Sequence, residues 1–154
     1  MLNPWTAKYA AIIEKYSKQY HFDSVLVAAV IQKESKFVNG TCFHGSHGLM
    51  QIQMSPRSCG RTLAIALIDG LYNPEINIQR GVQTMHLWRG WVSRNHMKHH
   101  WLLNYNQGYG SCPGKKRNCR KKERVPVDTG YADRVLSIYR KLKIVQEKRN
   151  GKES

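Results

Sequence analysis

The chain has 154 residues, 41% of them hydrophobic, and a formal net charge of +15. Its length and apolar content suit one globular domain with a real core, and no apolar run approaches the roughly 20 residues that cross a bilayer, so a disordered chain and a transmembrane helix are both excluded. The basic excess, 25 Lys and Arg against 10 Asp and Glu, favours a polyanionic partner such as nucleic acid, an anionic membrane face or an acidic cell-wall polymer.

Two helices are predicted in the first part of the chain. Apolar residues recur at helical spacing over about 4–20, which predicts the first helix. Asp23 or Ser24 can cap a second helix over about 24–35. This second segment, VLVAAVI, is apolar on nearly every side, so we expect it to be buried at the centre of the domain.

The middle of the chain combines a segment without regular periodicity and two predicted helices. Residues 39–60 are rich in Gly, Ser, His and Cys around the short run LMQIQM, which predicts a loop or a short helical turn. A short helix is then predicted over 61–69 and a longer one over 73–92. The inner face of the longer helix is expected to carry Ile78, Val82, Met85 and Trp88 or Trp91.

The last third predicts a helix that ends at Gly108, a basic loop over 110–126 and a terminal helix over about 129–146. No alternating strand pattern of useful length is present. The expected fold is therefore mainly α, a single helical domain over 1–145 followed by a basic tail over 146–154. The apolar stripe of the terminal helix is Val135, Ile138, Tyr139 and Leu142.

Four cysteines lie in predicted loops and fall into two pairs that are close in sequence. In an oxidising compartment Cys42–Cys59 and Cys112–Cys119 would be natural bridges, although the sequence leaves three connectivities open. In a reducing cytosol all four would be free thiols.

The histidines do not predict a metal site. His96 and His100 are spaced i, i+4, but the chain has no H-E-x-x-H pattern and no C-x-x-C pair. We therefore expect no metal and no other cofactor. The histidines, including His44 and His47 in the run HGSH, are expected at the surface.

Glu34 closes the apolar run VLVAAVIQKES, fourteen positions ahead of the run GLMQIQ, which starts at Gly48. The negative end of a helix dipole and an apolar setting both disfavour a second negative charge, so both raise the pKa of a carboxyl group placed there. A raised pKa is what a general acid needs near neutral pH. Taken alone, Glu34 also fits an exposed glutamate at a helix end.

Five motifs favour a catalytic glutamate over an exposed helix-end residue: AAVIQKES, GSHGLMQI, NPEINIQRG, NYNQG and GYADRVLSIYRKL. Their order and spacing, from about Ser24 to Leu142, resemble those of lysozyme-like lytic transglycosylases of the soluble lytic type. These enzymes form glycoside hydrolase family 23 with goose-type lysozyme. The resemblance implies a lysozyme-like helical domain and peptidoglycan glycan strands as substrate.

The resemblance also implies residue roles. Glu34 aligns with the catalytic acid/base, and Ser35 with the serine that follows it and helps to position substrate. The run Gly48–Gln51 matches a GLMQ turn, in which Met50 and Gln51 line the sugar cleft. Asn77, Ile78 and Gly81 match the N-I-x-x-G pattern of a family helix that packs behind the site.

Further on, Tyr105, Asn106 and Gly108 match an A-Y-N-x-G motif, with Tyr105 near the catalytic carboxylate and Asn106 toward substrate. Tyr131 matches the tyrosine of a closing Y-V-x-x-V helix that faces the cleft. The chain departs from the family pattern at three places: Asn104 in place of a small residue, Ala132 in place of a valine, and the basic two-cysteine loop, whose segment 114–124 leaves substrate preference and partner binding open.

An ordinary glycosidase needs two carboxylates beside the scissile bond. No second acid takes a catalytic place in these motifs: Glu75 follows Pro74, and Asp133, like Asp128, lies near Tyr131 in sequence. A single carboxylate suits a lytic transglycosylase, which cleaves the β-1,4 bond between N-acetylmuramic acid and N-acetylglucosamine and closes a 1,6-anhydro ring, because the substrate then supplies its own nucleophile. Glu34 would act first as acid and then as base.

Three other functions remain as alternatives. One is an inactive relative that only binds the cell wall, against which the intact set of Glu34, Gln51 and Tyr105 argues. A hydrolytic goose-type muramidase would use water instead of the sugar hydroxyl. A nucleic-acid-binding module would use KKRNCRKKER, but the aromatic residues lie mostly in apolar helical faces instead of interleaving the basic run, so no specific nucleic acid is expected.

The resemblance also predicts where the protein acts. We expect a monomer that is periplasmic, secreted or phage-associated and that holds an anionic cell-wall polymer. The start, MLNPWTAKYA, has no basic region followed by an apolar core, so no signal peptide is visible. Either a leader has been trimmed or the protein leaves the cell by another route.

Overall fold

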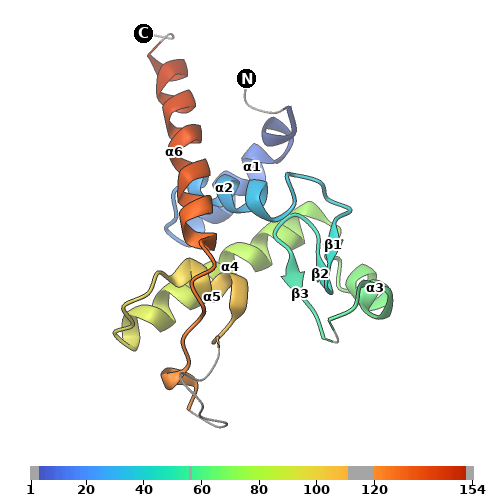
Figure 1. Cartoon of the computed structure of the whole chain (residues 1–154). Helices are drawn as coiled ribbons and strands as arrows, with labels where there is room; N and C mark the ends of the chain where they lie inside the picture. The colour runs from blue at the N-terminus through green and yellow to red at the C-terminus, as the bar shows by residue number, and fades with distance from the viewer. Residues whose placement is uncertain (1–3, 56, 111–119, 152–154) are drawn as a thin grey trace. The chain divides into compact units, whose positions relative to one another are not determined.

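The computed structural model describes residues 4–55, 57–110 and 120–151 (Figure 1). Within them the chain is mainly helical, so the predicted fold class is confirmed. The described helices are α1 (Pro4–Gln19), α2 (Ser24–Glu34), α3 (Cys59–Ile68), α4 (Pro74–Arg94), α5 (Trp101–Gln107), α6 (Tyr131–Asn150) and the short 3₁₀ helix η1 (Lys121–Glu123). Each helix predicted from the sequence is present close to its expected ends, except that α6 extends beyond its predicted end. No described helix is both long and apolar enough to span a membrane.

A small antiparallel sheet occupies the segment that was predicted to be a loop or a helical turn. Its strands are β1 (Cys42–Phe43), β2 (Ser46–His47) and β3 (Ile52–Gln53), in the order β1-β2-β3. The turn between β1 and β2 has two left-handed residues, His44 (φ 48°) and Gly45 (φ 75°), a conformation that suits a two-residue hairpin. Two-residue strands are too short to show an alternating pattern, so the prediction was wrong here.

The chain folds as two compact units. The first contains residues Met1–Val82 and Val135–Ser154, and the second contains Gln83–Arg134. The borders between the units fall within α4 and α6.

Helix α2 forms the core of the first unit, as predicted. Its residues from Val27 to Ile31 are at most 8% exposed, and α1 packs beside it with Tyr9, Ile13 and Tyr16 buried (Figure 1). The predicted inner face of α4 is also confirmed in this unit, because Ile78 and Val82 have no exposed surface. The core of this unit therefore combines the aliphatic residues of α2 and α4 with tyrosines of α1.

Asp23 holds two elements of the first unit together. Its carboxylate caps α2 by accepting a hydrogen bond from the Val25 N–H at 2.8 Å. The same carboxylate accepts the Tyr139 hydroxyl at 3.0 Å and pairs with Lys143 at 2.8 Å, both from α6. Burial alone would raise the pKa of Asp23, but these three donors outweigh it and lower the pKa.

In the second unit an aromatic cluster forms around the end of α4. Trp88 and Trp91 lie edge to face at 5.8 Å, and Tyr109 contacts both rings at 4.9 and 5.3 Å. The Gln107 side chain bonds both backbone groups of Val127, which ties the end of α5 to the segment before α6. The interior of this unit is formed by Met85, Leu102 and Asn104, which have no exposed surface.

Helix α6 continues to Asn150, so residues 146–150 of the predicted basic tail are helical. Only Val135 of its predicted apolar stripe is fully buried, and Ile138, Tyr139 and Leu142 are half-buried. The boundary of the catalytic domain at residue 145 stays a prediction.

Candidate active site

Glu34 is the last residue of α2 and is half-buried. Ser35 ends the helix: its N–H donates to the Ile31 carbonyl at 3.0 Å and its hydroxyl donates to the same carbonyl at 3.3 Å. Lys36 and Phe37 then reverse the chain with left-handed φ values of 53° and 64°. The Ser35 hydroxyl, expected near substrate, is thus bonded to α2, and the side chain is only 6% exposed.

A run of hydrogen bonds connects this helix end to the Gly48–Gln51 turn. The Val38 N–H donates to the Ser35 carbonyl at 2.9 Å, and the Thr41 hydroxyl donates to the Val38 carbonyl at 2.8 Å. The Thr41 carbonyl then accepts from the Gly48 N–H at 2.9 Å and from the Gln51 amide at 3.1 Å. The loop after Glu34 therefore sets the position of the turn.

The turn itself is held in a conformation that few residues adopt. Gly48 has φ 79°, and Gln51, which carries a side chain, has φ 50°. A left-handed residue other than glycine costs about 1–2 kcal/mol. The Gln51 amide nitrogen donates to the carbonyls of Gly48 at 2.8 Å and Thr41 at 3.1 Å, which stabilises this conformation.

Asn77 of α4 supports the turn from behind. Its Oδ1 accepts the Met50 N–H at 2.8 Å, and its Nδ2 donates to the carbonyls of His47 at 2.9 Å and Leu71 at 2.8 Å. Asn77 has no exposed surface. The sequence placed it on a helix behind the site, but only the structure shows that it fixes the backbone of Met50.

Two glycines leave room for this packing. A Cβ on Gly81 would lie 2.3 Å from the Met50 sulfur, and a Cβ on Gly48 would lie 2.2 Å from the Asn77 amide nitrogen. Both distances are too short for real side chains, so Met50 and Asn77 occupy space that only glycine frees. Met50 has no exposed surface, and the structure places it in the core instead of on an open sugar-binding face.

His47 of β2 corrects the expectation that the histidines lie at the surface, because it is fully buried. Its Nδ1 lies 2.7 Å from the Tyr72 hydroxyl and its Nε2 lies 2.6 Å from the Thr62 hydroxyl. Thr62 gives its own hydroxyl proton to the Ser58 carbonyl at 2.7 Å, so His47 donates to Thr62 from Nε2, and in the neutral ring Nδ1 then accepts the Tyr72 hydroxyl. Burial lowers the pKa of His47 and favours this neutral ring.

The Cys42–Cys59 disulfide joins β1 to the first residue of α3, with the Cα atoms 6.0 Å apart. It confirms one of the two bridges expected in an oxidising compartment. Cys112 and Cys119 lie outside the described residues, so the second bridge stays a prediction.

The second unit carries the remaining residues that the sequence assigned to the site. Tyr105 is half-buried and Asn106 is exposed, both on α5, whereas Tyr131 is 2% exposed at the first position of α6. The structure shows these residues within the second unit and Glu34 within the first. Their roles stay predictions.

Asn104, noted as a departure from the family motif, has a structural role in the second unit. It is fully buried, its Oδ1 accepts from His99 Nε2 at 2.6 Å, and its Nδ2 donates to the Gly108 carbonyl at 2.8 Å. His100 caps α5 by accepting the Leu102 N–H at 3.1 Å. Two histidines of the HMKHH run thus hold α5 in place, and among the described residues no group of three His, Cys, Asp or Glu could hold a metal ion.

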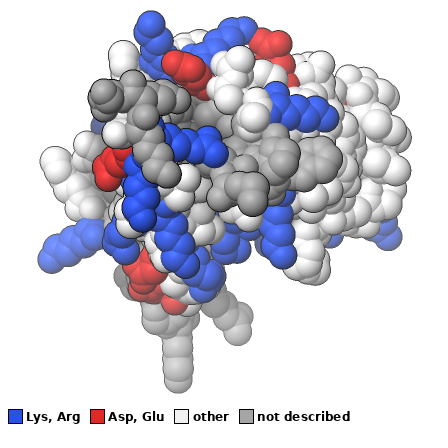
Figure 2. All heavy atoms as spheres, turned by 90° about the horizontal axis from the view of Figure 1, so that it is seen from above, with Lys and Arg blue, Asp and Glu red and all other residues white. Residues whose placement is uncertain are grey.

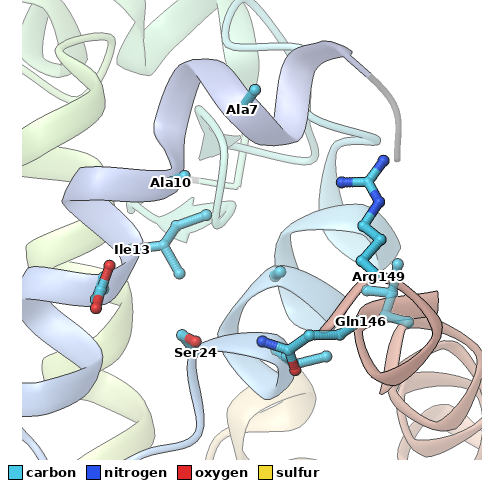
Figure 3. A pocket seen from close by; sticks show the side chains of 10 residues that line it. Ala7, Ala10, Ile13, Ser24, Gln146 and Arg149 are labelled. Carbon is cyan, nitrogen blue, oxygen red and sulfur yellow. The ribbon is translucent and has the colours of Figure 1, made fainter. Parts of the chain in front are cut away.

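A pocket of about 460 Å³ lies elsewhere in the first unit, between α1, the N-terminal half of α2 and α6 (Figure 3). Glu34 does not line it. The walls are mostly apolar, with polar side chains from α1, α2 and α6 among them. The lining residues are Ala7, Ala10, Ile13, Glu14, Ser24, Val25, Ala28, Leu142, Gln146 and Arg149.

The comparisons with known proteins agree with the motifs. The family model described as the transglycosylase SLT domain matches residues 11–126, well over half of the chain. Searches of curated proteins and of solved structures gave no match. The match includes Glu34, the Gly48–Gln51 turn and α5, whereas Tyr131 lies beyond it. The chain therefore belongs to the family of lysozyme-like lytic transglycosylases with an SLT domain, enzymes that degrade peptidoglycan.

Proposed function

We propose that this protein cleaves the β-1,4 bond between N-acetylmuramic acid and N-acetylglucosamine in peptidoglycan and forms a 1,6-anhydromuramic acid end, with Glu34 as its only acid/base. The observation that supports this most is the run of hydrogen bonds from Ser35 through Thr41 to the Gly48–Gln51 turn. It joins a half-buried carboxyl at a helix end to a rigid turn whose sequence matches the family motif.

The proposed reaction uses one carboxyl group twice. The protonated Glu34 gives its proton to the glycosidic oxygen while the bond from that oxygen to C1 of the muramyl sugar breaks. The N-acetyl group of the same sugar stabilises the positive charge that develops at C1. The Glu34 carboxylate then takes the proton of the C6 hydroxyl as O6 bonds to C1, which returns Glu34 to its protonated form and closes the anhydro ring.

The other described acids support a single-carboxylate site, because most of them have structural partners. Asp23 caps α2 and pairs with Lys143, Asp69 pairs with Arg80 at 3.5 Å, and Glu75 pairs with Lys15 and accepts the Tyr16 hydroxyl. In the second unit Glu123 caps η1, and Asp128 accepts the Gly130 N–H at 2.9 Å. Asp133 is exposed in the first turn of α6.

Gln51 is the turn residue best suited to meet the sugar. Its amide nitrogen is bonded to two backbone carbonyls, so the carbonyl oxygen of the side chain is the atom it offers to a hydroxyl or an N-acetyl N–H. We assign Tyr105, Asn106 and Tyr131 to the substrate as well, on the family motifs alone. Ser35, Gly48 and Met50 act by shaping the backbone around Glu34 and Gln51.

Product analysis tests the proposal. Purified peptidoglycan is digested with the protein, and the soluble fragments are separated and identified by mass spectrometry. We expect muramyl ends that lack one water relative to ordinary reducing ends, because the C6 hydroxyl has taken the place of water. Reducing muramic acid ends instead would identify a hydrolytic muramidase and overturn the anhydro-ring step while leaving the cleaved bond the same.

We also propose that the protein acts where peptidoglycan is accessible, in the periplasm, outside the cell or in a phage particle. The Cys42–Cys59 bridge supports an oxidising compartment of this kind. Isolating the native protein with its thiols blocked, and counting them by mass, checks whether the bridge is present in the cell.

A further inference from the structure

Helix α3 is unusual because it leaves most of its large apolar side chains in solvent. Only Thr62 and Ala66 are buried. Leu63 is 46% exposed, Ile65 45%, Leu67 60% and Ile68 84%. Exposed aliphatic residues are normally scattered over a protein surface. A cluster of four on one short helix instead indicates a surface that binds a partner.

The exposed residues of α3 cover more than one side of the helix. Leu63 and Leu67 are four residues apart, as are Ala64 and Ile68, so these pairs form two adjacent apolar rows. At 3.6 residues per turn, Ile65 lies on the opposite flank from Leu63. The apolar surface therefore wraps around the outer side of α3 and does not form a single narrow stripe.

The helix is nevertheless firmly attached to its unit. Cys59 at its first position is bonded to Cys42 of β1, and the Thr62 hydroxyl is bonded to buried His47. In Figure 1 α3 lies at the edge of the first unit, beside the small sheet. A covalent bond and a buried hydrogen bond hold the inner side of α3, so its leucines and isoleucines are not needed for that attachment.

The charges next to this apolar surface are basic. Arg57 and Arg61 are both exposed at the N-terminal end of α3. At the other end the Asp69 carboxylate is paired with Arg80 at 3.5 Å. Figure 2 shows Lys and Arg side chains spread over the face seen from above, and the whole chain carries a net charge of +15. The surface thus combines exposed aliphatic side chains with adjacent positive charge.

We propose that α3 binds the surface of an anionic lipid bilayer, with Leu63, Leu67 and Ile68 among the acyl chains near the headgroups and Arg57 and Arg61 at the lipid phosphates. Lipid fits better than a protein groove because acyl chains can surround a convex helix on several sides at once, whereas a groove covers one stripe. The arginines complement the negative lipid charge.

Vesicle binding tests the proposal. The full chain, with its disulfide intact, is sedimented with large vesicles of phosphatidylcholine alone and of phosphatidylcholine with phosphatidylglycerol. The aliphatic variant is Leu63→Gln, Leu67→Gln and Ile68→Gln together, because glutamine keeps the helix propensity and removes the apolar surface. Its matched control is Leu87→Gln, Val127→Gln and Ile144→Gln together, three aliphatic residues outside α3 that are 57%, 62% and 51% exposed.

We expect the wild type to bind the anionic vesicles, and the aliphatic variant to lose roughly tenfold or more in partition while the matched control keeps it. In the variant with Arg57→Gln and Arg61→Gln, the partition onto anionic vesicles should fall roughly fivefold for each arginine removed. The charge control is Arg140→Gln with Lys141→Gln, two exposed residues of α6 that carry the same total charge. It should lose clearly less.

Three results overturn the proposal: unchanged binding of the aliphatic variant, an equal loss in either control, or no binding by the wild type. Self-association that the aliphatic variant abolishes, measured by analytical ultracentrifugation without vesicle binding, would assign α3 to a protein interface instead. Circular dichroism checks that each variant is folded. Glu34→Gln should bind vesicles like the wild type, so a failure of the proposed reaction is distinguishable from a failure of this surface.

Discussion

Asn77 accepts the Met50 backbone N–H at 2.8 Å, and through this bond α4 fixes the turn that ends at Gln51. The amide of Asn77 also donates to the carbonyls of His47 and Leu71, so one buried side chain satisfies three backbone groups. Such a residue needs no contact with substrate to affect the reaction. It acts through the conformation that it imposes on the turn.

Replacing Asn77 should be costly for that reason. Asn77→Ala leaves one N–H and two carbonyls without their partner, and each buried polar group left unpaired costs about 1–3 kcal/mol. We expect the free energy of unfolding to fall by about 2–4 kcal/mol in urea titrations. Gln79→Ala, an exposed position on the same helix, is the control and should change stability by less than about 0.5 kcal/mol. Equal effects at both positions would contradict the role assigned to Asn77.

Glu34→Gln should abolish lysis without unfolding the protein. Glutamine keeps the shape of the side chain but can neither give nor take the proton, and acid–base catalysis contributes roughly 10²–10⁴-fold to rate. The release of soluble fragments from purified peptidoglycan measures the loss. Glu14→Gln, an exposed acid on α1, is the control and should retain full activity. A Glu34→Gln protein as active as the wild type would remove Glu34 from the mechanism.

Replacement by alanine should destabilise the protein at Gly81 but not at Gly60. In Gly81→Ala the new methyl group collides with Met50, and overpacking of a core typically costs about 1–3 kcal/mol. Gly60 lies in α3, where a Cβ would have no neighbouring atom within 4 Å, so Gly60→Ala should be neutral or stabilise by about 0.5–1 kcal/mol. Thermal unfolding of the two variants gives the comparison. If the two variants lose stability equally, the collision with Met50 does not explain the effect at Gly81.

His47 should make the fold sensitive to acid. Because burial holds its folded pKa below the ordinary value of 6.5, the unfolded chain takes up a proton first as the pH falls. The contribution of His47 to stability is therefore complete above about pH 6.5 and decreases as the pH falls below it. Denaturant titrations at a series of pH values should show this slope in the wild type. His47→Asn should show a smaller slope than the wild type, because His100, whose pKa is also lowered by desolvation, still contributes, whereas exposed His44→Asn should keep the wild-type slope.

The Cys42–Cys59 bridge should contribute measurably to stability, because it closes a loop with a sequence separation of 17. A loop of this length is expected to stabilise by about 3 kcal/mol through the unfolded chain. Cys42→Ser with Cys59→Ser should lower the midpoint of denaturant unfolding accordingly. Adding a reductant should not lower the unfolding midpoint of this variant through α3 any further, because the bridge to α3 is already absent. Unchanged stability of the double variant would show that the native contacts of α3 suffice.

The mainly α class, the helix positions and the buried centre of the first unit could all be predicted from the sequence. Each depends on local information: the apolar spacing over α2 and α4, the cap at Asp23 and the stop at Gly108. The family could also be predicted from the five motifs, because the order of motifs along the chain can be read from the sequence alone. Periodicity cannot detect strands of two residues, so the β1–β3 sheet was missed.

Only the tertiary structure decided which polar side chains are structural. Asn104 stood out as a departure from a motif, yet it is a buried amide bonded to His99 and Gly108. His47 was expected in solvent, yet it is buried between Tyr72 and Thr62. The reason is physical: periodicity and caps act between neighbours in sequence, whereas the partners of a buried polar atom come from segments that only folding brings together.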